Sequence, residues 1–127
     1  MREGKRALIV DDNEFVCKTV AKILEKMNVE VLSAGDGKKA LKLLKKHTDL
    51  DIIFLDLFLP GVSGWKLLEE LKTGSLTRDI PVVVLSSAPI TDEKTEEISK
   101  EVAAFVDKDE FDVQSFEKLV RGLLSWR

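Results

Sequence analysis

Four short apolar runs of the sequence end in polar or charged side chains that could carry out chemistry. These side chains are Asp11 and Asp12, Asp56, Ser86 and Lys108. Clustered carboxylates repel one another and raise one another's pKa, so a group of three is costly without a cation. Oxygen ligands in small number suit Mg²⁺, and neither His nor Cys stands among these residues to favour Zn²⁺. If the fold brings the three carboxylates together, we expect a magnesium site.

Lys108 and Ser86 would add the groups that a phosphoryl oxygen requires. The lysine offers a point charge and the serine a hydroxyl donor. Asp56 ends the run DIIFLD, which is otherwise apolar after its first residue. A carboxylate that attacks phosphorus forms an acyl phosphate, and a metal ion and a lysine can neutralise the charge of the group in transfer. We therefore expect Asp56 to accept a phosphoryl group.

Five apolar runs alternate with amphipathic segments along the chain. The runs are residues 7–10, 29–32, 52–55, 81–85 and 103–106. Between them, apolar residues recur every three or four positions, which is the spacing of helices. The third such segment follows Ser63 and Gly64, and the mostly polar fourth is expected from about Thr91 to Glu101. Strict alternation predicts an α/β fold with a doubly wound five-stranded parallel sheet, flavodoxin-like, with helices on both faces.

The composition of the runs predicts their order in the sheet. Glu30 interrupts the second run and the fifth run is short, so both suit edges, which gives strand order 2-1-3-4-5. Ligands of such sheets bind outside the carboxyl ends of the strands, near the point where the order reverses. The polar groups that end the first, third, fourth and fifth runs should therefore converge at one edge.

Length and charge exclude several classes of protein. The 127 residues are 44% hydrophobic and contain no repeat or Pro/Gly/Ser-rich linker, which is typical of a single domain. The net charge of −3 gives no basic field for nucleic acid, so direct nucleic-acid binding is not expected. No segment approaches the roughly 20 apolar residues of a membrane helix, so we expect no membrane insertion and a cytoplasmic location.

Four motifs together resemble the receiver domain of response regulators in two-component signalling, of the single-domain, chemotaxis-regulator-like kind. The motifs are LIVDDN with Asp11 and Asp12, FLDLFLPGVSG with Asp56, VVVLSS with Ser86 and AAFVDK with Lys108. The resemblance covers essentially the whole chain, so residues 1–127 are expected to form one receiver domain, with no output domain in this chain. It implies a phosphorylation-activated switch that catalyses only its own phosphorylation and dephosphorylation.

The resemblance also implies roles for particular residues. Asp12 and Asp56 would bind Mg²⁺ directly with the backbone carbonyl of Phe58, and Asp11 would act largely through water. Ser86 and Phe105 would be the switch residues.

Partners are implied in the same way. The phosphoryl donor would be a sensor histidine kinase or a histidine phosphotransfer protein. The fourth helix, fifth strand and fifth helix would signal to an output protein that the sequence does not name.

One position departs from the family pattern. The family usually has Pro after the lysine, often in a cis peptide, whereas Asp109 follows Lys108 here. A cis bond without Pro costs about 3 kcal/mol, so we expect a trans bond. The neighbouring Asp107, Asp109 and Glu110 are candidates to compete for Lys108.

Three other functions fit parts of the sequence. Phosphatases of the haloacid dehalogenase type need a second carboxylate two residues after the nucleophile, where this chain has Phe58. A flavin carrier needs a phosphate-cradling loop after the first strand, and DDNEF would repel the phosphate. A receiver-like docking module that phosphorylation does not control stays open.

Phe58 and Ala88 lie two residues beyond Asp56 and Ser86. Neither side chain can accept a hydrogen bond from an attacking water, and Phe58 is bulky enough to shield the phosphorus. We therefore expect a long-lived phosphorylated form. The alternative is that Phe58 points away and packs on the third helix.

Overall fold

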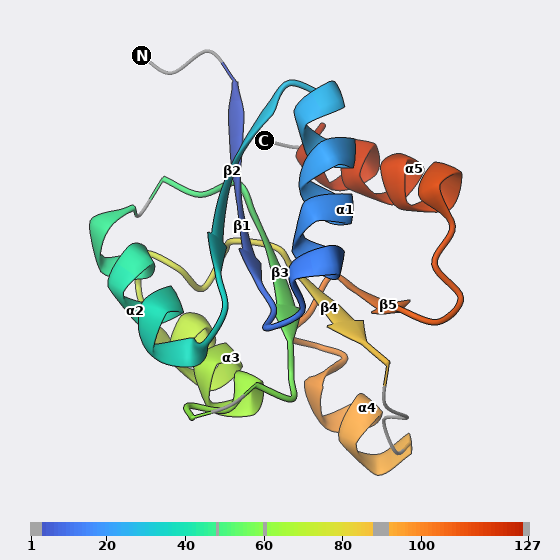
Figure 1. The fold of residues 1–127 in the computed structure, drawn as a ribbon. Coiled ribbons are helices and arrows are strands. Elements are labelled where there is room, and N and C mark those ends of the chain that lie inside the picture. Colours follow the sequence, from blue (N-terminus) through green and yellow to red (C-terminus); the bar gives the residue numbers. More distant parts are fainter. Residues whose placement is uncertain (1–3, 48, 60, 88–91, 126–127) are drawn as a thin grey trace.

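Five strands alternate with five helices in the computed structural model, which describes residues 4–47, 49–59, 61–87 and 92–125 (Figure 1). The strands are β1 (Lys5–Val10), β2 (Val29–Ala34), β3 (Ile52–Asp56), β4 (Val82–Ser86) and β5 (Ala104–Asp107). The helices are α1 (Glu14–Lys26), α2 (Gly37–Lys46), α3 (Gly64–Thr73), α4 (Asp92–Ile98) and α5 (Val113–Leu124). None of these helices combines the length and the apolar character that crossing a membrane would require.

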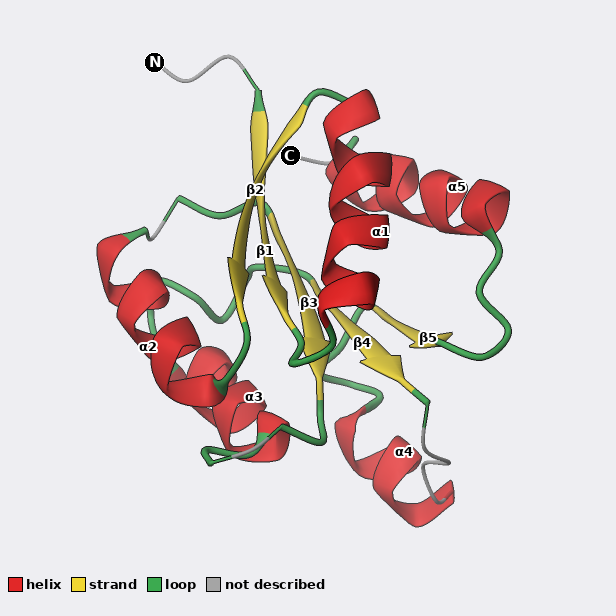
Figure 2. Ribbon diagram, in the orientation of Figure 1, coloured by secondary structure: helices red, strands yellow, loops and turns green. Residues whose placement is uncertain are grey.

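The strands form one parallel sheet in the order β2-β1-β3-β4-β5, which confirms the predicted fold. Figure 2 shows the strands between the helices of the two faces. Every residue of β3 and β4 is buried, whereas the edge strands β2 and β5 are only partly buried. Continuous apolar runs therefore mark the interior strands, because helices cover both of their faces.

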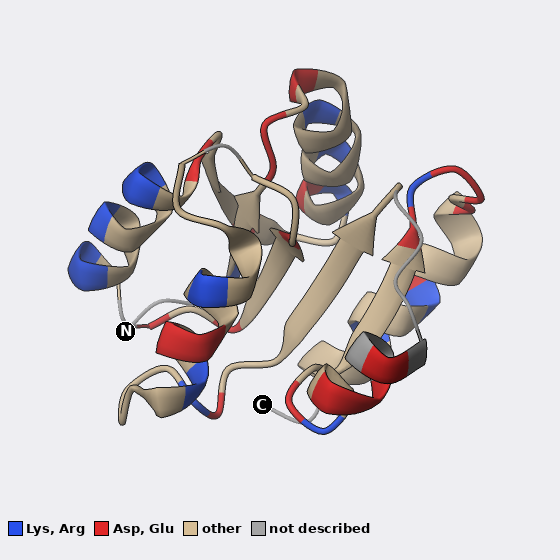
Figure 3. Cartoon of the chain, turned by 90° about the horizontal axis from the view of Figure 1, so that it is seen from below, with Lys and Arg blue, Asp and Glu red and all other residues tan. Residues whose placement is uncertain are grey.

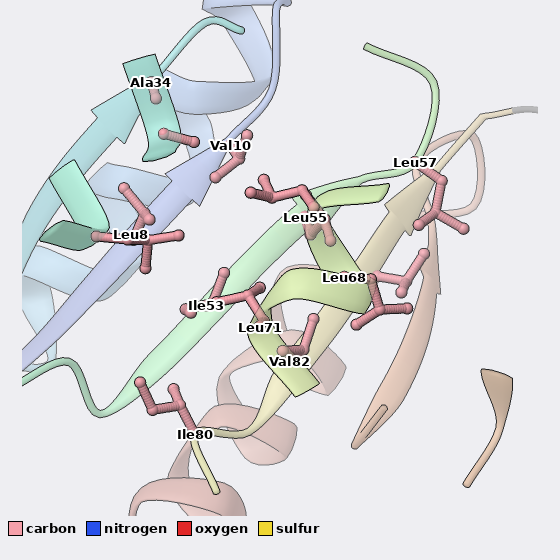
Figure 4. Close-up of a cluster of buried hydrophobic side chains, with 14 of the residues drawn as sticks. Leu8, Val10, Ala34, Ile53, Leu55, Leu57, Leu68, Leu71, Ile80 and Val82 are labelled. Carbon is pink, nitrogen blue, oxygen red and sulfur yellow. The ribbon is translucent and has the colours of Figure 1, made fainter. Parts of the chain in front are cut away.

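Two apolar cores lie on opposite faces of the sheet. On one face, side chains of α2, α3 and α4, such as Leu44, Leu68 and Ile98, pack against β1, β3 and β4. Figure 4 shows part of this core, with Leu55 and Leu68 pointing into it. On the other face, α1 and α5 cover residues such as Ile9 and Phe54. Two layers of helices thereby cover the sheet on both of its faces.

Helix α4 is shorter than the sequence predicts. It ends at Ile98, and the expected end at Glu101 is wrong because the chain turns there, where the Glu101 N–H donates to the Ile98 carbonyl at 2.8 Å. Such an i to i−3 bond tightens the chain and ends an α-helix. The expected start at Thr91 lies outside the described residues.

Candidate functional site

The carboxyl ends of four neighbouring strands bring together the side chains singled out by the sequence. Asp11 directly follows β1, Asp56 and Ser86 are the last residues of β3 and β4, and Lys108 directly follows β5. Asp11, Asp56 and Ser86 are buried, with 1%, 5% and 7% of their surfaces exposed. Asp56 thus lies at the end of its strand, as expected, but it is covered rather than open to solvent.

Lys108 forms ion pairs with two buried carboxylates. Its Nζ lies 2.6 Å from Asp11 Oδ2 and 3.1 Å from Asp56 Oδ2. Burial lowers the pKa of Lys108, but the two carboxylates outweigh that effect and raise the pKa above its usual range. The ammonium group is therefore charged in the site at neutral pH, where it can neutralise an anion.

Burial also raises the pKa of Asp11, and contact with Lys108 offsets this only in part. Asp11 Oδ2 is buried without a hydrogen bond of good geometry from any described group, so the ion pair with Lys108 is its main support. A second cation would relieve this cost, because an unsatisfied buried carboxylate oxygen is expensive.

The same local turn orients Asp11 and Asp56. Asp11 Oδ1 accepts a hydrogen bond from the Asn13 N–H at 2.9 Å, and Asp56 Oδ1 accepts one from the Phe58 N–H at 2.9 Å. Aspartate commonly bonds the backbone two residues on in this way. Because Oδ1 is held, Oδ2 of each carboxylate is directed at Lys108.

Asp11, Asp12 and Asp56 form an acidic group that fits a hard divalent cation. One oxygen from each lies within 4.8 Å of the others, and Asp12 is exposed while its partners are buried. Among the described residues, Lys108 pairs with two of these three carboxylates, so excess negative charge remains. Oxygen donors of this number leave room for water and phosphoryl oxygens around Mg²⁺. The residues present therefore fit the ion that the sequence analysis expects.

The two aromatic residues singled out by the sequence are both partly exposed. Phe58 has 51% of its surface exposed and is not part of either core, so about half of its surface is covered by neighbouring residues. Phe105 is 38% exposed and lines a groove of about 260 Å³ between β5 and α5. Ala88 lies outside the described residues.

The acidic residues of the loop after β5 were candidates to compete for Lys108, but the lysine pairs with carboxylates of other strands. The described residues contain no cis peptide bond, as expected for the bond before Asp109. Lys108 pairs with Asp11 and Asp56, and the Asp107 carboxylate instead accepts the Asp109 N–H at 2.8 Å. The sequence analysis missed this turn, although the Asp-Lys-Asp spacing is a signal for it.

The thiol of Cys17 makes a second contact that sequence reasoning missed. Cys17 Sγ donates to the Asp11 carbonyl at 3.3 Å, and Cys17, a residue of α1, packs against the core on that face of the sheet. Its position six residues after Asp11 reflects the sharp turn from β1 into α1, which a linear sequence does not show.

Gly64, the first residue of α3, allows this helix to begin directly against the end of β3. A Cβ atom at this position would clash with the Asp56 carbonyl oxygen and the Leu57 Cα. These are backbone atoms, so Gly64→Ala is expected to destabilise the chain by about 3 kcal/mol, measured by urea unfolding. Gly122→Ala in α5 is the control, since a Cβ there meets no atom within 4 Å. An equal loss in both variants would contradict the role given to Gly64.

Residues 7–121 match the family model described as the response regulator receiver domain. The two-component response regulator ARR11 of Arabidopsis thaliana is 38% identical over 84 residues, which make up 65% of this chain and 16% of that protein. The chain spans between 16% and 66% of the length of this and other curated relatives that it matches.

Solved structures share the fold. The N-terminal domain of a response regulator receiver protein from Methanoculleus marisnigri JR1 is 30% identical, with a TM-score of 0.75 over 96% of this chain and 98% of that chain. The receiver domain of the sensor histidine kinase PA1611 from Pseudomonas aeruginosa PAO1, solved with a magnesium ion coordinated in its active site cleft, is 18% identical. Its TM-score is 0.83 over 96% of this chain and 98% of that chain.

Proposed function

Because the chain belongs to the response regulator receiver domain family of two-component signalling, we propose that it is a switch activated by phosphorylation of Asp56. The observation that carries the proposal is the position of Lys108. Its Nζ lies 3.1 Å from Asp56 Oδ2 and also forms an ion pair with Asp11. The ammonium group already lies where the oxygens of a phosphoryl group on Asp56 would gather.

In the proposed reaction, a carboxylate oxygen of Asp56 attacks the phosphorus of the donor and the bond to the leaving group breaks. Lys108 neutralises charge on the transferring group, and the Ser86 hydroxyl is the proposed donor to one of its oxygens. Mg²⁺, bound by Asp12, Asp56 and the Phe58 carbonyl with Asp11 acting through water, would supply further neutralisation of charge. The magnesium ion coordinated in the active site cleft of the PA1611 receiver domain supports the choice of Mg²⁺.

The proposed donor is a sensor histidine kinase or a histidine phosphotransfer protein, as in the family. Transfer from a phosphohistidine would break its P–N bond and form the acyl phosphate on Asp56. The chain would then act as a switch rather than as an enzyme on external substrates.

The proposed output surface consists of α4, β5 and α5. Its exposed carboxylates include Glu93, Glu96 and Glu97 on α4, Asp107 at the end of β5, and Asp109, Glu110 and Asp112 after β5, while α5 exposes the basic Lys118 and Arg121. Figure 3 shows this acidic region on α4 and the loop after β5, with the lysines of α2 on another part of the molecule. Because complementary charge favours association, we expect an output protein that contributes basic residues opposite α4 and the loop after β5.

Phosphorylation should change this output surface more than the rest of the chain. Helix α4 has few apolar anchors, chiefly the buried Ile98 at its end and the half-buried Val102 just after it, so little free energy holds it in one position. Movement of Ser86 toward a phosphoryl group would alter the space near Phe105. Amide exchange with and without a phosphate mimic should therefore differ most between residues 86 and 105. Changes confined to α2 would contradict this surface.

The phosphorylated form is expected to persist. Phe58 is half-exposed beside Asp56, where its ring can exclude water, and it cannot hold a water for attack. Replacing Phe58 with Asn and Ala88 with Glu should speed the loss of phosphate, measured by intact mass at fixed Mg²⁺. An unchanged lifetime in the double variant would show that these positions do not control hydrolysis.

The direct test of the function is incubation of the purified chain with Mg²⁺ and acetyl phosphate, followed by intact mass. The proposal predicts one added phosphoryl group, which should be absent when Mg²⁺ is removed by a chelator. A chain that stays unmodified under conditions that modify a known receiver would favour the docking module that phosphorylation does not control.

A further inference from the structure

The same aspartate turn occurs at three strand ends around the site. Asp11 and Asp56 each bond the backbone N–H two residues on, and Asp107 does so as well, accepting the Asp109 N–H at 2.8 Å. In the first two turns the aspartate itself faces the site. In the third turn, the middle residue is Lys108, whose ammonium group pairs with the carboxylates of Asp11 and Asp56.

Lys108 needs support from its backbone because its side chain is long and flexible. Holding a lysine in one geometry costs conformational entropy, and the ammonium group must meet two carboxylates at once. The Lys108 N–H donates to the Ser86 carbonyl at 3.0 Å, which fixes the backbone on the N-terminal side of the Lys108 side chain. The hydrogen bond from the Asp109 N–H to the Asp107 carboxylate fixes the backbone on the C-terminal side of Lys108.

The charge of Asp107 is not used in this arrangement. Asp107 is exposed at the end of β5, and the ion pairs of Lys108 with described residues go to Asp11 and Asp56. What Asp107 supplies is a hydrogen-bond acceptor at a set distance from the backbone. Asparagine could supply the same acceptor, since Asn and Asp form this kind of turn alike.

We propose that Asp107 is a positioning residue for Lys108, which acts through the turn that it forms with the Asp109 N–H. The inference rests on the proposed function, because phosphoryl transfer to Asp56 is the reaction that Lys108 serves. Loss of the turn would leave the lysine present, but its ammonium group would be less well oriented toward the transferring group.

The test compares Asp107→Ala with Asp107→Asn in the full chain. With saturating Mg²⁺ and acetyl phosphate, Asp107→Ala should slow the initial rate of phosphorylation by about tenfold, since small displacements of a catalytic group are costly. Asp107→Asn should stay within about twofold of the parent chain, because its amide oxygen restores the acceptor. An equal loss in both variants would assign the effect to charge, and an unchanged rate in Asp107→Ala would remove the role altogether.

A double-mutant cycle separates this role from general damage to the fold. If Asp107 acts through Lys108, adding Asp107→Ala to Lys108→Ala should change the residual rate by less than about twofold. A tenfold further loss in that background would overturn the proposal.

Amide exchange at Asp109 tests the turn without phosphorylation. Exchange of this N–H should be faster in Asp107→Ala than in the parent chain or in Asp107→Asn. Unchanged exchange would show that the turn is not the support proposed. If the parent chain takes up no phosphoryl group, the proposed function fails and the role in it fails too, while the exchange result still decides whether the turn exists.

Discussion

An Asp56→Asn chain is expected to take up no phosphoryl group from acetyl phosphate in the presence of Mg²⁺. The amide that replaces the carboxylate is a poor nucleophile, and it removes the negative oxygen that lies 3.1 Å from Lys108 Nζ. Asn keeps an acceptor for the Phe58 N–H, so the turn after β3 should survive. Intact mass after incubation measures the effect.

Asp51→Asn is the matched control, since it makes the same chemical change at the other end of β3. Asp51 Oδ2 accepts the Arg6 N–H at 2.8 Å, a bond that an asparagine oxygen can also accept. This variant should be phosphorylated like the parent chain. Uptake by Asp56→Asn to the parent level would show that another residue is the acceptor.

Mg²⁺ alone should raise the melting temperature of the chain. Asp11, Asp12 and Asp56 repel one another in the folded state, and one oxygen of Asp11 is buried without a good hydrogen bond. An ion that binds only the folded state stabilises it by about 2.7 kcal/mol at a hundred times its dissociation constant. For a chain of this size, that corresponds to a rise of roughly 10 °C.

The rise should disappear in Asp12→Ala, which removes the exposed carboxylate of the acidic group. Asp36→Asn is the control, because Asp36 caps α2 by accepting the Lys39 N–H, and asparagine can cap a helix equally well. The control should keep the full rise. A rise of the same size in Asp12→Ala would place the metal elsewhere.

Much of the fold could be predicted because the burial of each strand determines the pattern of apolar residues in its sequence. Strands β3 and β4 are covered on both faces and therefore read as unbroken apolar runs, while Glu30 marks β2 as an edge. A parallel sheet then collects its strand ends at one edge, so Asp11, Asp56 and Lys108 could be placed together before any contact was known.

The details that could not be predicted depend on distances in three dimensions. Asp107 and Asp109 are the neighbours of Lys108 in the sequence, yet the lysine pairs with Asp11 and Asp56 from other strands. Which carboxylate pairs with Lys108 depends on the direction in which the turn orients the lysine side chain. The end of α4 was missed for a similar reason, since polar residues continue beyond Ile98 and only the backbone bond of Glu101 shows the stop.

The central claim is that Asp56 carries the phosphoryl group, and peptide mass mapping of the chain treated with Mg²⁺ and acetyl phosphate tests it most directly. Reduction with borohydride before digestion converts an aspartyl phosphate to homoserine and so marks the modified position. The account predicts this mark at Asp56 and at no other aspartate. A mark at Asp11 or Asp12, or a phosphoryl group that the mapping places on a serine or threonine, would contradict it.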